Sequence, residues 1–323
     1  MDNTDSFSSR HFRLEQLADG VYAGIHVEGG WAICNVGIID LGDRTLVFDA
    51  FQSTDAARDL RHAAENLIDN PIHAVINSHY HSDHIWGNQV FDSGVDIISS
   101  AKTRELIATE GSKEVQDFRD VSQKRLEILE AQYAEARDET VKASLKLWID
   151  EFQGVIATLP ELNVRLPNLT FNSELTFIGP KRSARLIDYE GGHCGSDAVL
   201  HLPEDGIVFM GDLLFTEAHP TLAEGDADKT QSTLVQVRKL QAGIFVPGHG
   251  PVGQAASLDE LDEYINTLRA LVCDAIHRGA TEAEIEKIGI PGKFQSWIFP
   301  TFFATNLKSL YHRQIDGETG SIT

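Results

Sequence analysis

The densest group of possible metal ligands in the chain follows a short apolar run. Residues 73–77 predict a strand, and His79-Tyr80-His81-Ser82-Asp83-His84 comes just after it. Imidazole nitrogen and carboxylate oxygen suit Zn²⁺ and other borderline divalent ions, whereas a histidine in an ordinary core needs only one hydrogen-bond partner. Three imidazoles and a carboxylate within six residues therefore indicate a metal site at the end of a strand. The fold must bring other segments of the chain next to this site.

Three further ligand types stand beside glycines where other predicted strands end. They are His193 in Gly191-Gly192-His193-Cys194-Gly195, Asp212 in Gly211-Asp212, and His249 in Pro247-Gly248-His249-Gly250. Glycine lets the backbone turn sharply and approach a bound ion, and strand ends in open α/β sheets are where ligand crevices form. Each residue alone is as well explained by a turn, but the repeated arrangement favours ligands.

Two β-rich blocks flank a helical stretch. The first has strand-like runs at 21–27, 33–41 and 45–50, helical spacing at 54–70, and the strand at 73–77. The second begins near residue 169 and has runs at 175–178, 184–189, 198–202 and 207–210, followed by a helix at 232–242 and a strand at 244–246. Helices at 258–278, 282–288 and 302–313 close the chain. This order predicts the α/β class.

Residues 112–158 interrupt the alternation of strands and helices. The stretch is rich in Glu, Lys, Gln, Ala and Arg and has no proline, which predicts one long helix or a helical hairpin with its turn at 137–140. Apolar residues such as Phe118, Tyr133 and Trp148 recur at helical spacing in both halves. Apolar stripes exposed to solvent favour aggregation unless other protein surface packs on them. We therefore expect the segment to overhang the site or to join two chains as a homodimer.

Composition narrows the class of partner. The formal charge of −22, from 49 acidic and 27 basic side chains, repels a phosphate backbone and disfavours nucleic acid. No apolar run reaches the ~18–20 residues of a membrane helix, and the start lacks the apolar stretch of a secretory signal. Cys34, Cys194 and Cys273 are too widely spaced for a disulfide framework or a cysteine zinc finger. We expect a cytoplasmic protein that acts on a small molecule, with no membrane partner.

The ligand motifs also occur in the order of a known family. His-x-His-x-Asp-His, Gly-Gly-His-x-Gly, Gly-Asp and Pro-Gly-His-Gly together resemble the metallo-β-lactamase superfamily over about residues 15–255. The resemblance implies an αββα sandwich with the site along one edge of the two sheets. We expect a single domain over residues 1–323, with residues 112–158 as a helical insertion and residues 257–323 as a C-terminal helical region.

The resemblance assigns metal ligands by position. It implies His79, His81 and His193 for a first ion, Asp83, His84 and His249 for a second, and Asp212 as a bridge between them. Asp49, at the end of the run 45–50, resembles the aspartate with which the family orients a ligand histidine. The cofactor implied is a pair of divalent ions, zinc first, with iron or manganese as alternatives.

The activity implied is hydrolysis by a hydroxide that bridges two metal ions. Asp83 has a second expected role as the catalytic residue, which accepts a hydrogen bond from the hydroxide and helps to protonate the leaving group. No Gly-x-Ser-x-Gly motif competes as a nucleophile. β-Lactamases of this superfamily usually have cysteine or serine in place of the bridging aspartate. Asp212 therefore favours a carboxylic ester, lactone or thioester substrate, as in lactonases and glyoxalase II.

Two alternative functions stay open from the sequence. One is a β-lactamase-like or sulfatase hydrolase, and the other is a mononuclear iron oxygenase of the persulfide dioxygenase kind, which resembles the chain at the same histidines. Trp31 and His219 are candidate substrate-binding residues. Each has a structural alternative, a partly buried anchor for Trp31 and an ordinary loop histidine for His219. Tyr80 and Trp86 are expected to support the ligand loop.

Overall fold

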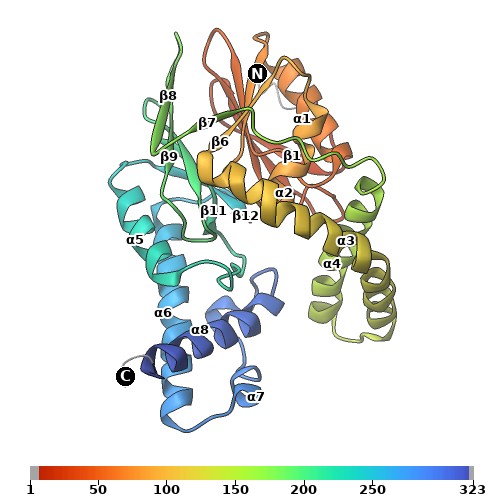
Figure 1. Cartoon of the computed structure of the whole chain (residues 1–323), viewed down its shortest axis with the longest axis vertical. Helices are drawn as coiled ribbons and strands as arrows, with labels where there is room; N and C mark the ends of the chain where they lie inside the picture. Colours follow the sequence, from red (N-terminus) through yellow and green to blue (C-terminus); the bar gives the residue numbers. More distant parts are fainter. Residues whose placement is uncertain (1–6, 320–323) are drawn as a thin grey trace.

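Two β-sheets lie face to face in the upper part of the computed structural model as drawn in Figure 1, and the structure describes residues 7–319. The first sheet has the order β1 (Phe12–Ala18), β2 (Val21–His26), β3 (Val36–Asp40), β4 (Thr45–Phe48), β5 (Ile72–Ile76), β6 (Asp96–Ser100) and β7 (Leu169–Phe171). The second has the order β12 (Ile244–His249), β11 (Ile207–Phe215), β10 (Ala198–Leu202), β9 (Ser183–Asp188) and β8 (Glu174–Ile178).

The first sheet changes direction in its middle. β1 to β4 form an antiparallel meander, whereas β4 to β7 run parallel. In the second sheet β11 and β12 are the parallel pair. Parallel neighbours end at the same edge of a sheet, so the segment that follows β5, the second half of β11 and the end of β12 can meet there.

Apolar side chains from both sheets fill the space between them. Ile39, Leu46 and Phe48 from the first sheet pack with Leu200 and Phe209 from the second, and all are buried. Gly37 lies under the ring of Phe209, where a Cβ atom would collide with it. The close approach of the sheets therefore requires glycine at this position.

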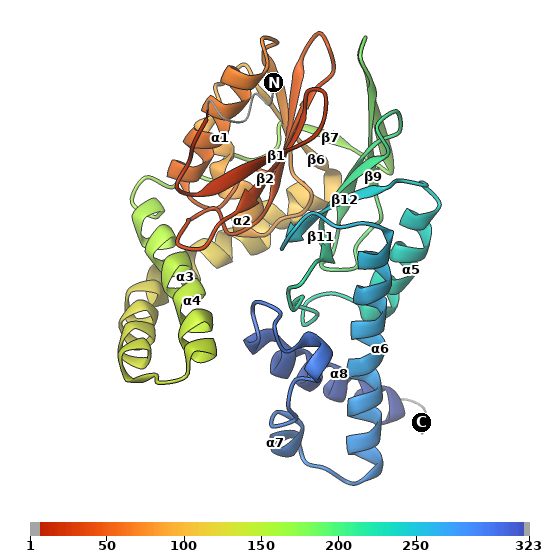
Figure 2. The same cartoon turned by 180° about the vertical axis from the view of Figure 1, so that it is seen from behind.

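Helices cover the outer face of each sheet, which completes the αββα order (Figure 2). On the first sheet lies α1 (Thr54–Leu67), which begins where the Ser53 side chain accepts from the backbone N–H of Ala56. On the second lie α5 (Ala227–Arg238) and one end of α6 (Ala255–His277). Below the sheets in Figure 2, α8 (Thr301–Thr319) packs against α6, and α7 (Glu282–Ile285) packs against α8. None of the described helices is long and apolar enough to cross a membrane.

A long helical hairpin leaves the first sheet directly after β6. Its helices are α3 (Ala101–Glu135) and α4 (Glu139–Thr158). α3 starts eleven residues before the expected boundary at residue 112, because Ser100 caps it by accepting from the N–H of Thr103. The hairpin extends to the same side of the sheets as α6 to α8 (Figures 1 and 2).

Several element boundaries differ from the sequence-based expectations. β1 and β6 were not predicted, and β11 continues past residue 210 to Phe215. β3 begins at Val36 rather than at Ile33, because Ile33 has a φ of 67°, which no strand residue adopts. α5 lies at 227–238 rather than 232–242, since the Asp226 side chain caps it. The ends of the expected 1–323 domain, residues 1–6 and 320–323, lie outside the described residues.

Candidate metal centre

The loop that carries the first histidines is held in place by Asp49. β5 ends at Ile76, and Ser78 in the loop donates its backbone N–H and its hydroxyl to the two oxygens of Asp49, each at 2.8 Å. The carbonyl of Ser78 also accepts from the N–H of Ala198 at 2.9 Å, which ties the loop to the second sheet. The short helix α2 (Ser82–Ile85) and the 3-10 turn η2 (Trp86–Val90) then carry the chain away.

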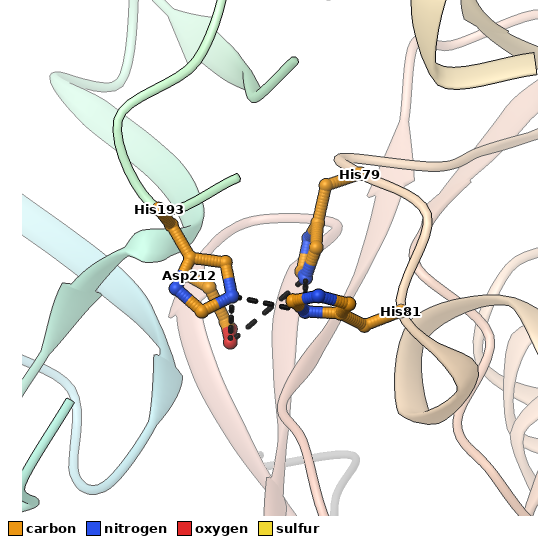
Figure 3. Close-up of side chains that lie close together, drawn as sticks. All are labelled: His79, His81, His193 and Asp212. Carbon is orange, nitrogen blue, oxygen red and sulfur yellow. Dashed lines mark hydrogen bonds and ion pairs between the residues drawn. The ribbon is translucent and has the colours of Figure 1, made fainter. Parts of the chain in front are cut away.

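A first cluster forms where this loop meets the second sheet (Figure 3). His79 Nε2 and His193 Nε2 lie 3.0 and 2.9 Å from His81 Nδ1. Asp212 Oδ2 is 3.3 Å from His193 Nε2 and 3.9 Å from His79 Nε2. The other ring nitrogens of His79 and His81 have partners outside the cluster, so one nitrogen of each of these rings is free to face a metal ion.

A second cluster lies directly beside the first. Asp83 Oδ2 is 3.4 Å from His84 Nε2 and 3.3 Å from His249 Nε2. Asp212 joins this cluster too, with Oδ1 at 3.1 Å from His84 Nε2 and Oδ2 at 3.3 Å from His249 Nε2. Asp49 lies 2.8 Å from His84 Nδ1, which turns Nε2 of that ring toward the cluster.

Asp212 belongs to both clusters because of its position on β11. The strand continues through residue 212 to Phe215, which brings the carboxylate to the edge where β12 ends at His249. Gly248 lies so close to Asp212 Oδ1 that a Cβ atom at residue 248 would collide with it. The sequence Pro247-Gly248-His249 thus has glycine where the two strands approach most closely.

The loop between β2 and β3 fastens this edge from the other sheet. Asn35 is buried and donates its side-chain amide to the carbonyls of Pro247 and Gly250, at 3.0 and 2.8 Å. Its backbone N–H donates to the carbonyl of Gly248 at 2.7 Å. Asn35 therefore fixes the backbone on both sides of His249, a role that no sequence motif indicated.

The two clusters fit divalent metal ions. His84 Nε2 and Asp212 Oδ1 are buried, face each other and have no hydrogen-bond partner. Burial acts to raise the pKa of Asp212, but the charges of His249, His84 and His193 together hold it well below its usual value. Burial lowers the pKa of His79 well below its usual value. Ionised carboxylate and neutral imidazole are the forms that bind Zn²⁺ and similar ions.

His249 shows what a metal ion has to displace. Burial acts to lower its pKa, yet the carboxylates of Asp212 and Asp83 raise it to about 10. Without a metal ion the imidazole is therefore protonated at neutral pH and paired with these carboxylates. A divalent ion takes the place of that proton, which makes metal affinity depend on pH.

The two cysteines near the clusters stay neutral. Cys34 is buried, donates its thiol to the carbonyl of Asp83 at 2.9 Å, and has its pKa raised to about 12 by burial. Burial also raises the pKa of Cys194, which lies beside Asp197. A thiol that does not ionise is a poor nucleophile.

A cavity of about 250 Å³ opens over both clusters. It is lined by Ile33, His81, Ser82, Asp83, Glu114, Phe118, Trp148, Glu151, Asp212, Phe215, Thr221, Glu224, His249, Phe299 and Phe302. The hairpin α3 and α4 supplies part of this wall. Trp148 of α4 contacts Phe299 and Phe302, with ring centroids 5.8 and 5.6 Å apart. The hairpin therefore meets the start of α8 and the segment just before it over the site.

The cavity lining includes neither of the two residues expected to bind substrate. Trp31 lies against Gly154 of α4 and under the guanidinium of Arg10, so it joins the hairpin to the N-terminal segment. His219 is buried against Tyr264, with its Nδ1 3.0 Å from the hydroxyl oxygen of that tyrosine. The structure thus places Trp31 and His219 in packing positions, as in the structural alternative for each.

Tyr80 and Trp86 lie around the ligand loop. The hydroxyl of Tyr80 donates to Glu224 at 2.6 Å. Trp86 is buried and contacts Phe118 of α3, with ring centroids 5.4 Å apart. Both residues connect the ligand loop to elements that form the wall of the cavity.

Sequence reasoning missed several side chains at the site. Glu224 Oε2 lies 3.2 Å from His81 Nε2, and Glu114 and Glu151 line the cavity. Glu114 and Phe118 are four residues apart on α3, and Trp148 and Glu151 three apart on α4. Pairs at these spacings share a helix face, so an acidic and aromatic face of the hairpin was visible in the sequence. Glu224 lies in a loop without a motif.

Comparisons with known proteins agree with this geometry. A model of the metallo-beta-lactamase superfamily matches residues 29–249, more than half of the chain. A metallo-beta-lactamase from Pontibacter korlensis has a TM-score of 0.58 and 17% identity, covering 79% of this chain and 99% of that one. The metallo-beta-lactamase FIM-1 from Pseudomonas aeruginosa, in a mono-zinc form, has a TM-score of 0.57 and 14% identity, covering 80% and 96%. A search of curated proteins gave no match.

Proposed function

The chain belongs to the metallo-β-lactamase superfamily and is a metallo-hydrolase, and from this premise we propose that it holds two zinc ions and cleaves a carboxylic ester, lactone or thioester. His79, His81 and His193 would hold the first ion, and Asp83, His84 and His249 the second. The single observation that carries the proposal is the position of Asp212. Its Oδ1 lies 3.1 Å from His84 in one cluster, and its Oδ2 lies 3.3 Å from His193 in the other.

Bound metal ions would lower the pKa of a water molecule and polarise the bond under attack. The chain supplies the groups around that water. Asp83 lines the cavity and would accept a proton from the attacking water, then return it to the leaving group. Ion-pair contacts with His84 and His249, at 3.4 and 3.3 Å, hold its carboxylate in position. Asp49 and Glu224 orient His84 and His81 from behind.

The clusters and the cavity favour this activity over the alternatives. One group of ligand types consists of His79, His81, His193 and Asp212, and another of His84, Asp212 and His249. Asp83 lies within ion-pair distance of His84 and His249, so the ligand types suffice for two ions rather than for the single iron of an oxygenase. Position 212 has a carboxylate, in contrast to the cysteine or serine expected of a β-lactamase. The solved structures named above share 14–17% identity with this chain, so their likeness shows the fold and leaves the substrate to the residues of the cavity.

A metal measurement and a substrate panel test the proposal. We expect two equivalents of zinc per reconstituted chain, and a higher kcat/KM for esters, lactones or thioesters than for β-lactams or sulfate esters. Asp83→Asn serves as a control for the proton-transfer role and should lower kcat on the best substrate. One metal per chain would refute the dinuclear site, and nitrocefin as the best substrate would refute the ranking. Iron with oxygen consumption would identify an oxygenase.

A further inference from the structure

The charged wall of the cavity has only one sign. Apart from the histidines, its ionisable side chains are Asp83, Glu114, Glu151, Asp212 and Glu224. Among the described residues that line it there is no lysine or arginine. Asp83 and Asp212 belong to the metal clusters, and Glu224 pairs with His81. Glu114 and Glu151 are the acidic groups that remain in the wall, and no described lysine or arginine lines it beside them. A substrate carboxylate would find no cationic side chain to pair with in this wall.

Glu114 has an unsatisfied oxygen in this wall. Its Oε1 accepts a hydrogen bond from Ser82 at 2.8 Å, whereas its Oε2 is buried and has no hydrogen-bond partner. Burial raises the pKa of Glu114 to about 7. A buried acceptor without a donor costs free energy, and a donor that enters with a ligand recovers it.

Glu151 reaches the same cavity from α4. Burial and the charges of Asp83 and Glu114 raise its pKa to about 8, although His249 acts in the opposite direction. The nearby lysines of the hairpin are paired elsewhere, Lys113 with Glu110 and Lys146 with Asp150. Two carboxylates from facing helices thus stand in one wall without a cation from the chain among the residues that line it.

Aromatic rings adjoin the two glutamates. Phe118 follows Glu114 by one helical turn, and Trp148 precedes Glu151 by three residues. Both rings line the cavity, and Trp148 is fixed by its contacts with Phe299 and Phe302. Carboxylates beside aromatic faces attract organic cations, because the ring quadrupole and the negative charge act in the same direction.

We propose that the outer part of the cavity binds a protonated primary or secondary amine, so that the substrate is an ester, lactone or thioester with an ammonium group separated from the scissile bond by an apolar stretch. Glu114 and Glu151 accept the N–H bonds of the ammonium group, and Phe118 and Trp148 contact the apolar stretch. The inference rests on the proposed hydrolase function and adds the substrate class. An N–H donor is specified because Glu114 Oε2 lacks one.

Three esters of equal chain length test the preference. The p-nitrophenyl esters of 6-aminohexanoate, heptanoate and pimelate end in an ammonium, a methyl and a carboxylate group. For the zinc-loaded protein we expect kcat/KM to fall about tenfold at each step of this series, chiefly through KM. The double variant Glu114→Gln/Glu151→Gln should bring the ratio of the first two esters close to one. Glu130→Gln, an exposed residue of α3, is the matched control and should keep the ratio.

Calorimetry separates this inference from the proposed function. n-Hexylammonium should bind the zinc-loaded protein about fivefold more tightly than N,N,N-trimethylhexylammonium, which has no N–H group, and the double variant should lose that difference. If no ester, lactone or thioester is cleaved, the proposed function fails, and the binding difference still decides this inference. Ester cleavage with equal rates for the ammonium and methyl esters would overturn the inference alone. A third metal equivalent in the wild-type protein that the double variant lacks, with no amine binding to either, would show that Glu114 and Glu151 hold a metal ion instead. That result would also overturn the inference.

Discussion

The metal clusters and the outer wall of the same cavity are built in different ways. The ligands stand at strand ends and in adjoining loops, are mostly buried, and are held by further buried groups such as Asp49, Ser78 and Asn35. The wall comes from helices α3 and α4 and from the segment before α8, and Phe118 and Trp148 in it are half-buried. The strands and their adjoining loops carry the candidate metal ligands, whereas the helices supply much of the cavity wall. We therefore expect the sheets to set the class of reaction and the helices to select the substrate.

The largest effect should come from Asp212, the side chain shared by the two clusters. Asp212→Ala should release at least one metal equivalent and lower kcat/KM by roughly 10³-fold, because the metal ions supply most of the activation. Elemental analysis and steady-state kinetics on the reconstituted variant measure both. Glu130→Gln, on the exposed face of α3, is the control. Two retained metals with activity within tenfold of wild type would show that residue 212 does not bridge.

The metal clusters could be predicted from sequence because their constraints are local. The histidines and aspartates occur in short motifs with glycine beside them, and Gly248 shows why, since a side chain there would collide with Asp212. Strands β2, β4 and β5 were predicted for the same reason, as buried strands between clear turn signals. β1 and β6 were missed. β1 alternates irregularly in burial, and β6 runs directly into α3 without a turn.

The wall could not be predicted, because it depends on contacts between segments far apart in the chain. The sequence predicts Trp148 only as an apolar residue on the packed face of a helix. Its place in the cavity wall follows from its contacts with Phe299 and Phe302, which are far away in the chain. Phe299 has a φ of 58°, a conformation set by tertiary packing rather than by its own preference. Trp31 and His219 are not among the residues that line the cavity, because proximity in sequence to a motif does not fix where a side chain points.

A second prediction compares two carboxylates that orient ligand histidines, one buried and one exposed. Asp49 is fully buried, whereas the Glu224 side chain is 61% exposed. Asp49→Asn places an amide group against His84 Nδ1 and should weaken metal binding by about 10- to 100-fold. Glu224→Gln should weaken it by about 2- to 5-fold, because solvent screens the exposed pair. Competition with a chelator measures both affinities, and equal losses would contradict the distinction.

A third prediction concerns pH. In the metal-free protein the pKa of His249 is raised to about 10. The protonated imidazole therefore contributes stability that is fully present below about pH 6.5 and is lost as pH rises through 10. Metal binding has the opposite dependence, since it must displace that proton. The difference in Tm between zinc-loaded and metal-free protein should therefore widen by at least about 3 °C from pH 6.5 to 9. Thermal unfolding at both pH values measures it, and a constant difference would mean that His249 is not a ligand.

A fourth prediction tests the wall alone. Trp148→Ala removes the ring contacts with Phe299 and Phe302 and should raise KM by about 3- to 10-fold, while the metal content stays at the wild-type value. Trp148→Phe should recover most of the loss because it keeps an aromatic surface. Elemental analysis and kinetics on the same samples separate the two regions. A loss of metal in the alanine variant would show that the wall and the clusters are not independent.

The smallest effect on catalysis should come from the far end of the hairpin, which lies beyond the cavity. Val121, Ile128, Tyr133 and Val141 are large apolar residues that are 38–49% exposed. Exposed apolar residues gathered on one projecting element favour association, so the expected homodimer through the hairpin stays a prediction of this surface. Replacing residues 127–143 by a short Gly/Ser linker keeps Glu114, Phe118, Trp148 and Glu151 in place. We expect the mass from light scattering to halve and kcat/KM to change less than about twofold, since none of these positions lines the cavity. A monomeric wild-type protein would refute the dimer, and a large fall in kcat/KM would show that the far end of the hairpin holds the wall in shape.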